Sequence, residues 1–245
     1  MKVYLNKITG IDDAIVSMYM SKRSWNREEE KYIRKMCELV NDKCGKYHEY
    51  DITSVIGDKY WSDYDDYMKK LTKWTKIHIT LGKFIDFSIT VEGLHRAGQD
   101  DWDSHAQRFN NRIIRSSTRM ADFDYEMSDY YDDKIIPTDI ALSENNINIP
   151  NYIERNGIKY IKTVNGYIRE DLKDNKDVKR GLYMLSIPSN FIFKINLTEW
   201  AHVYKERNID TNANPEVKEL CESIADELER FQPYFTRELF NQIKN

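Results

Sequence analysis

The sequence predicts a single α+β domain, with a mostly antiparallel sheet flanked by helices. Three observations lead to this class. Apolar residues recur at helical spacing near both ends of the chain, a strand-like alternation lies between them at 85–91, and two Asn-Gly dipeptides at 150–170 mark hairpins. No repeat or low-complexity linker divides the 245 residues, so we expect one domain over residues 1–245.

Two helices are expected in the first third of the chain. Residues 28–41 carry an apolar face at helical spacing, formed by Ile33, Met36, Cys37 and Val40. Residues 60–74 carry another, formed by Tyr64, Tyr67, Met68, Leu71 and Trp74. These faces are the sides that we expect to be buried.

The spacing of the apolar residues then changes from the helical period to the alternation of a strand. Apolar residues alternate with polar ones at Ile85, Phe87, Ile89 and Val91, which indicates a strand with one buried face. A helix is expected to follow from about Leu94, although Gly98 and the acidic run 100–103 weaken that pattern.

The segment 150–170 is expected to form a three-stranded meander inserted into the domain. Asn156-Gly157 and Asn165-Gly166 separate runs rich in β-forming residues. Asn-Gly favours a tight hairpin turn because both residues accept positive φ.

The last third of the chain returns to helix. One helix is expected from Asn196 to about Arg207, and another from Glu216 to Arg230. The latter has an apolar stripe formed by Val217, Leu220, Cys221, Ile224 and Leu228. Pro233 follows it as a helix breaker.

Composition and charge exclude several classes of protein. A net charge of −4 and a pI near 5.8 argue against a protein that coats nucleic acid. No apolar run is long enough to span a bilayer, and the N-terminus lacks the apolar segment of a signal peptide. The three cysteines, Cys37, Cys44 and Cys221, lie far apart without zinc-type spacing. We therefore expect a cytoplasmic protein without a metal site, and the Asn-, Lys- and Ile-rich composition is typical of a low-GC bacterium or its virus.

The run Arg115-Ser116-Ser117-Thr118-Arg119 is the strongest functional signal in the residues themselves. Arginine matches phosphate oxygens bidentately and serine adds a directed donor, so the run can grip a phosphate monoester. Together with Arg180 and Arg207, it indicates a site for a nucleotide or a phosphorylated cofactor. The alternative is a solvated basic face of a helix.

Isolated histidines give a weaker signal. His78, His105 and His202 each have the alternative of a surface or structural role, and no second His or Cys completes a metal site beside His105. The chain has no GxSxG, P-loop or GxGxxG motif. The residues alone therefore predict a soluble α+β domain with an anion site.

The order of these pieces resembles the flavin-dependent thymidylate synthases. That family shows an arginine before a short apolar run, then a helix of the form N-x-x-x-x-x-H/N-x-x-x-x-R, then a helix that begins A-Q-x-E. Over residues 179–235 this chain has the corresponding residues in the same order: Arg180, Asn196, His202, Arg207, Ala213 and Glu216.

Three upstream stretches extend the resemblance to about two-thirds of the chain. His78-Ile79-Thr80 with Phe87-Ser88-Ile89 is similar to the family's H-E-S/T-P-F-E-H at the start of a strand. The stretch 91–97 is similar to G-V-S-R-A at the start of a helix, and Ser117-Thr118-Arg119-Met120 is similar to S-x-R-Y.

The resemblance implies an FAD-dependent methyltransferase that converts dUMP to dTMP with methylenetetrahydrofolate and NADPH, in a homotetramer with shared active sites. In that scheme Ser117, Arg119 and Arg180 bind the nucleotide phosphate. Arg207 also binds the nucleotide and is the catalytic residue, because it polarises the uracil ring. The flavin side of the site comprises His78, Thr80, His105, Asn196 and His202.

The chain departs from the family at its signature R-H-R-x7-S. The nearest counterpart, Ser104-His105-Ala106, keeps the histidine and loses both arginines. Three hypotheses follow: an active dUMP methylase of viral type acting in a bacterial host, the same fold and flavin acting on dCMP or dUMP by methylation or hydroxymethylation, and a non-catalytic nucleotide-binding protein.

Overall fold

The computed structural model describes residues 1–22, 25–41, 57–106, 112–116, 138–163, 166–175, 187–209 and 214–243. The chain divides into two compact units. The larger unit comprises residues 2–91, 101–114 and 192–245, and the smaller comprises residues 1, 92–100 and 115–191. The expectation of a single domain stays a prediction.

The main sheet has four strands in the order β1 (Lys2–Thr9), β2 (Asp86–His95), β7 (Pro188–Asn196) and β3 (Arg112–Arg115). The predicted strand at 85–91 is confirmed as part of β2, where Phe87, Ile89 and Val91 are buried. Strand β7 was not predicted, although its alternation buries Phe191, Phe193 and Ile195 in the same way. One face of β2 and one face of β7 therefore supply the core.

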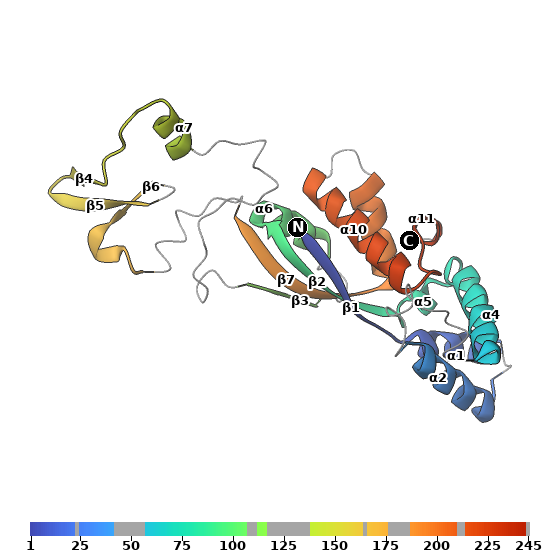
Figure 1. Cartoon of the computed structure of the whole chain (residues 1–245). Helices are drawn as coiled ribbons and strands as arrows, with labels where there is room; N and C mark the ends of the chain where they lie inside the picture. The colour runs from blue at the N-terminus through green and yellow to red at the C-terminus, as the bar shows by residue number, and fades with distance from the viewer. Residues whose placement is uncertain are drawn as a thin grey trace. The chain divides into compact units, whose positions relative to one another are not determined.

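Helices α1 (Ile11–Ser21), α2 (Arg27–Asn41) and α4 (Asp58–Thr75) pack on one another in the larger unit, as Figure 1 shows. The apolar face predicted for 28–41 is confirmed, because all four of its residues are at most 1% exposed. In α4 the predicted face is also buried, except for Trp74, which is half-buried.

Gly10 fixes the junction between β1 and α1. Its φ of +83° is in the left-handed region, and a Cβ there would lie 1.8 Å from the carbonyl oxygen of Phe84. Only glycine fits this close approach of two backbone segments. The N-terminal strand is thereby seated against the turn that precedes β2.

The C-terminal part of the larger unit is helical. It contains α9 (Leu197–Tyr204), a π-helical turn η6 (Lys205–Ile209), α10 (Pro215–Phe231) and α11 (Arg237–Gln242). The predicted helix 216–230 is confirmed as α10, which packs its apolar stripe against β1 (Figure 1). The predicted helix from Asn196 to Arg207 is regular only to Tyr204, where the π turn begins.

The predicted meander is confirmed as a separate sheet of β4 (Tyr152–Arg155), β5 (Ile158–Thr163) and β6 (Gly166–Arg169), all antiparallel. Arg155 pairs with Ile158 around Asn156 and Gly157, whose φ values are 54° and 75°. These positive values are those of the turn that Asn-Gly favours. The smaller unit also holds the helix α7 (Thr138–Glu144) and the turn η4 (Glu170–Leu172).

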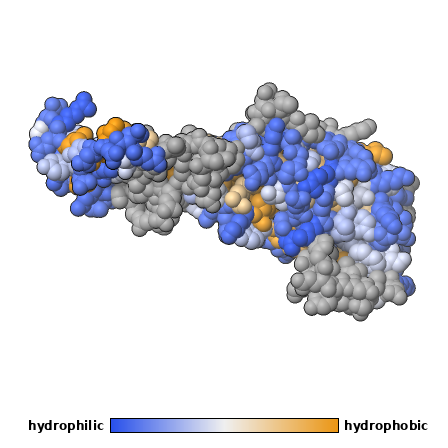
Figure 2. Space-filling view, turned by 45° about the horizontal axis from the view of Figure 1, so that its top comes forward, coloured by the Kyte–Doolittle hydropathy of each residue, from blue (hydrophilic) through white to orange (hydrophobic). Residues whose placement is uncertain are grey.

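The predicted α+β class is confirmed, with helices flanking antiparallel strands. A helix was expected from about Leu94, and the structure begins α6 (Arg96–Ala106) two residues later. The face drawn in Figure 2 is mainly hydrophilic, with hydrophobic residues in separate patches. Within the described residues, every helix is too short or too polar to cross a membrane.

Candidate functional site

A tight junction joins helix α5 (Ile79–Gly82) to the beginning of α9. The hydroxyl of Thr198 donates a hydrogen bond of 2.7 Å to the carbonyl oxygen of Ile79, although the two residues are 119 positions apart. A Cβ on Gly82 would lie 2.4 Å from the hydroxyl oxygen of Thr198. The junction therefore has no room for any side chain at position 82.

Three residues assigned to the flavin side lie in the segments that form this junction. His78 precedes α5, is exposed, and stacks on Trp74 with ring centroids 5.1 Å apart. Thr80 is exposed within α5. Asn196 is the N-cap of α9, where its side-chain oxygen accepts a hydrogen bond of 2.9 Å from the backbone N–H of Glu199. His78 thus does not open the strand directly, because α5 intervenes.

The other flavin-side residues are less closely grouped. His202 lies farther along α9 and is half-buried. The backbone of His105 belongs to α6, but its side chain lies outside the described residues.

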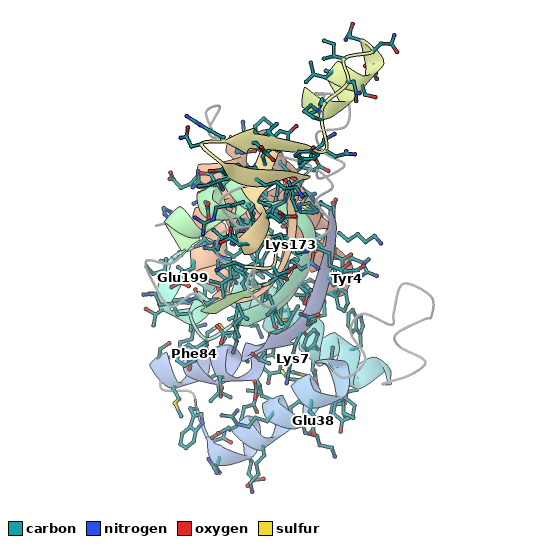
Figure 3. The ribbon with its side chains drawn as sticks, turned by 90° about the vertical axis from the view of Figure 1, so that its left-hand side faces the viewer. Tyr4, Lys7, Glu38, Phe84, Lys173 and Glu199 are labelled. Carbon is teal, nitrogen blue, oxygen red and sulfur yellow. The ribbon has the colours of Figure 1, made fainter. Side chains whose placement is uncertain are left out.

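Glu199 lies in the first turn of α9, at this junction (Figure 3). The sequence analysis did not identify it. Its side chain is half-buried, and among the described residues its Oε2 atom has no hydrogen-bond partner. Burial raises the pKa of this carboxyl, a shift that Asn196 and Lys83 oppose. The spacing Asn196-x-x-Glu199 is that of a capping box, which is the signal that could have found it.

Arg207 is buried and faces Asp101 of α6. Its Nη2 donates to the carbonyl oxygen of Asp101 at 2.9 Å and lies 3.1 Å from the carboxylate Oδ1. The Arg207 side chain is 9% exposed and the Asp101 side chain 30%. Arg207, which the resemblance assigns to the pyrimidine ring, is therefore already paired with the carboxylate of Asp101.

Cys221 lies close enough to this pair for Arg207 and Asp101 to influence it electrostatically. Burial raises the pKa of the Cys221 thiol far above its ordinary range. Cys37 is likewise buried and free, and Cys44 lies outside the described residues. Of the described cysteines, Cys221 therefore lacks the thiolate character of a nucleophile.

The residues assigned to the phosphate lie outside the described ranges: Ser117, Arg119 and Arg180. Their neighbour Arg115 is described, and it pairs with Asp100 at 3.1 Å. Arg108, Arg112 and Arg115 could compensate for the two arginines missing at Ser104 and Ala106, and of these only Arg115 has a described side chain. The described residues show no group of three or more His, Cys, Asp or Glu side chains that could hold a metal ion.

A polar cavity of about 510 Å³ opens between α1, α2 and α4. None of the residues assigned from the sequence lines it. Two of its carboxylates already accept hydrogen bonds from tyrosine hydroxyls, in the pairs Tyr32–Asp63 and Tyr67–Glu29. We therefore place the candidate site at the α5–α9 junction and at Arg207, and not in the cavity lined by Tyr19, Glu29, Tyr32, Lys59, Asp63, Asp66, Tyr67 and Lys70.

Comparison with solved structures identifies the fold. A flavin-dependent thymidylate synthase, ThyX, from Helicobacter pylori complexed with FAD and dUMP matches 98% of this chain and 99% of its own, with a TM-score of 0.54 and 12% identity. A second structure of Helicobacter pylori ThyX with FAD and dUMP matches 98% and 100%, with a TM-score of 0.53 and 13% identity. No protein-family profile matches the sequence, and no curated protein is similar to it in sequence. The chain has the fold of the flavin-dependent thymidylate synthases.

Proposed function

We propose that this protein is a flavin-dependent enzyme that methylates dUMP to dTMP with methylenetetrahydrofolate and NADPH. The α5–α9 junction is the observation that carries the proposal. It joins α5, which follows His78 and contains Thr80, to the start of α9, which Asn196 caps. The family resemblance assigns these three residues to the flavin side of the site. The two ThyX structures with this fold contain FAD and dUMP, which supports the same ligands here.

The donors at the junction fit the polar groups of FAD. The exposed imidazole of His78 and the exposed hydroxyl of Thr80 can donate to carbonyl and ring-nitrogen acceptors. FAD, when bound, supplies the hydride chemistry that these side chains lack. The role of this chain is then to hold and orient the flavin, with His105 and His202 as further contacts.

On the nucleotide side, the arginines divide between the phosphate and the pyrimidine ring. Ser117, Arg119 and Arg180 would bind the phosphate through charge-assisted hydrogen bonds. Arg207 would stabilise negative charge on the ring as C5 becomes a nucleophile, and burial strengthens that effect by excluding water. Attack by C5 itself requires no cysteine, in agreement with the raised thiol pKa of Cys221. As in the family, we propose that the active sites are shared between subunits of a homotetramer in the cytoplasm.

A second candidate function is the same chemistry on another pyrimidine nucleotide, and Asp101 favours it. A carboxylate accepts a hydrogen bond from the amino group of cytosine and repels the O4 carbonyl of uracil. With Asp101 3.1 Å from Arg207, the pair offers an acceptor beside a donor, which suits the N3 and amino edge of dCMP. Uracil can meet the same pair through O2 and N3–H, so dUMP stays the first candidate.

Product analysis tests the proposal directly. The protein is incubated with FAD, NADPH and methylenetetrahydrofolate, and with dUMP or dCMP in separate reactions, and the nucleotides are analysed by mass spectrometry. We expect dTMP from dUMP. A methylated or hydroxymethylated product from dCMP alone would establish the second candidate. If FAD binds but neither nucleotide gives a product, the result would favour the third hypothesis, a non-catalytic nucleotide-binding protein.

A further inference from the structure

The turn that carries Arg207 departs from regular helix. Residues 205–209 form a π turn directly after α9, in which each hydrogen bond spans five residues. Such turns are rare, and they occur often at functional sites. A single π turn of this kind needs contacts from elsewhere in the fold to hold it.

Those contacts come from α10 and from the end of α11, and they hold residues on both sides of Arg207. The hydroxyl of Tyr204 donates 3.1 Å to Oε1 of Glu222, and the side-chain amide of Asn208 donates to the same oxygen. Lys205 donates from Nζ to the carbonyl oxygen of Ile243, just after α11. The residues that flank Arg207 are thus hydrogen-bonded to α10 and to the end of α11, while Arg207 itself pairs with Asp101 of α6.

Glu222 is held in place by the first residue of α11. Nε of Arg237 lies 2.9 Å from Oε2 of Glu222, and the other guanidinium nitrogens pair with Asp226 and Glu229 at 2.6 Å each. One planar guanidinium that meets three carboxylates in fixed directions gives a defined geometry. The two oxygens of Glu222 therefore connect α11 on one side with the π turn on the other.

We propose that Glu222 is a positioning residue for Arg207. It fixes the π turn through Tyr204 and Asn208, and so sets the direction of the guanidinium without contacting the nucleotide. The inference rests on the proposed function, in which Arg207 addresses the pyrimidine ring. It adds that nucleotide binding depends on how α11 is anchored through Arg237.

A double-mutant cycle tests the inference in the full-length protein saturated with FAD. The affinities for dUMP and dCMP are measured by calorimetric titration for the wild type, Glu222→Gln, Arg207→Lys and the double variant. The matched control is Glu227→Gln on the same helix, whose carboxylate pairs with Arg230 at 2.6 Å on the surface. Thermal unfolding of every variant separates a loss of stability from a loss of affinity. Asn208→Ala, which keeps Glu222, replaces Glu222→Gln if that variant does not fold.

We expect Glu222→Gln to weaken binding of the preferred nucleotide about five- to tenfold, the size of one lost ordinary hydrogen bond. Glu227→Gln should leave the affinity unchanged. In the Arg207→Lys background, Glu222→Gln should have no further effect, because its influence passes through Arg207.

Independent effects of the two substitutions would overturn the positioning role, as would a Glu222→Gln variant that is less stable but binds normally. If Arg207→Lys leaves the affinity unchanged, the assignment of Arg207 fails first and the inference fails with it. If the wild type binds neither nucleotide, the proposed function is wrong. These outcomes are distinguishable within one set of titrations.

Discussion

At the scale of single residues, we expect the pair of buried Arg207 and half-buried Asp101 to determine which base the nucleotide site recognises. A carboxylate 3.1 Å from the guanidinium offsets the positive charge that would act on a pyrimidine ring. Asp101→Asn removes that charge and keeps a hydrogen-bond acceptor of the same size. We expect the affinity for dUMP relative to dCMP to rise about tenfold, since one well-placed contact discriminates bases by roughly 1–3 kcal/mol.

The control for this prediction is Asp100→Asn, which removes the same charge from the neighbouring position of α6. Its carboxylate pairs with Arg115 and is 62% exposed. Calorimetric titration with both nucleotides gives the ratio for each variant. If the ratio of the dUMP and dCMP affinities is the same in the wild type and in Asp101→Asn, Asp101 does not select the base.

Glu199 gives a pH-dependent prediction. Burial raises the pKa of its carboxyl above the ordinary value of 4.5, so the folded protein holds this proton more tightly than the unfolded chain. Charging Glu199 therefore costs stability above the raised pKa, and the cost disappears below pH 4.5, where both states are protonated. Glu199→Gln should raise the Tm at pH 7 and have no effect at about pH 4.

Thermal unfolding at the two pH values measures this effect, and the exposed Glu219 of α10, changed to Gln, is the control. An equal gain in Tm at both pH values would mean that glutamine stabilises for a reason unrelated to charge. A loss at pH 7 would show that the carboxylate of Glu199 is paired in the folded protein.

The cysteines provide a third prediction at this scale. Cys37 and Cys221 are both buried, and the raised thiol pKa of Cys221 keeps that thiol protonated. Replacing these two with Ala and Cys44 with Ser should lower stability by roughly 1–2 kcal/mol for each buried site. Turnover per folded molecule should survive. A triple variant that is folded and flavin-loaded but inert would point to covalent catalysis.

At the scale of elements, we expect the packing of α5 against α9 to position the residues assigned to the flavin. Gly82→Ala would place a Cβ 2.4 Å from the Thr198 hydroxyl oxygen and 3.3 Å from its backbone nitrogen, so the two elements must separate. We expect a loss of about 1–3 kcal/mol in the free energy of unfolding, as for overpacked cores, together with weaker FAD binding. Chemical denaturation and fluorescence titration with FAD measure the two effects.

The double variant Gly82→Ala with Thr198→Ala is the matched test of this packing, because it removes the oxygen that the new methyl group meets. Part of the lost stability should return. If the double variant is as unstable as the sum of the two single variants, the contact at Thr198 is not the cause.

The elements also show what the sequence can predict. The helices 28–41, 60–74 and 216–230 were predictable because each has several turns with an apolar face, and such a face is buried in almost any packing. The short helix α5 was not, because a single turn depends on tertiary contacts. Strand β7 has nine residues that alternate like those of β2, so its pattern was present in the sequence and was missed. The π turn at 205–209 has no sequence pattern of its own.

The site was predictable only in part, for a related reason. His78 and Asn196 were assigned from the order of motifs along the chain. The pairing of Asp101 with Arg207 joins residues 106 positions apart, and nothing local in either segment predicts it. Glu199 could have been predicted from its capping-box spacing with Asn196. Ser117, Arg119 and Arg180 stay predictions.

At the scale of the whole molecule, the fold is that of an enzyme family whose arginine-rich signature is absent from this sequence. Two thymidylate synthase structures match nearly the full chain at only 12% and 13% identity. Fold is kept at such identities more readily than function. The central claim is therefore that this protein still binds a flavin.

Titration of FAD with the purified full-length protein, followed by visible absorbance, tests that claim most directly. We predict a saturable change in the flavin spectrum and a further change when dUMP or dCMP is added, because the base would lie close to the flavin. A flavin spectrum that stays that of free FAD at saturating protein, with or without nucleotide, would contradict the account.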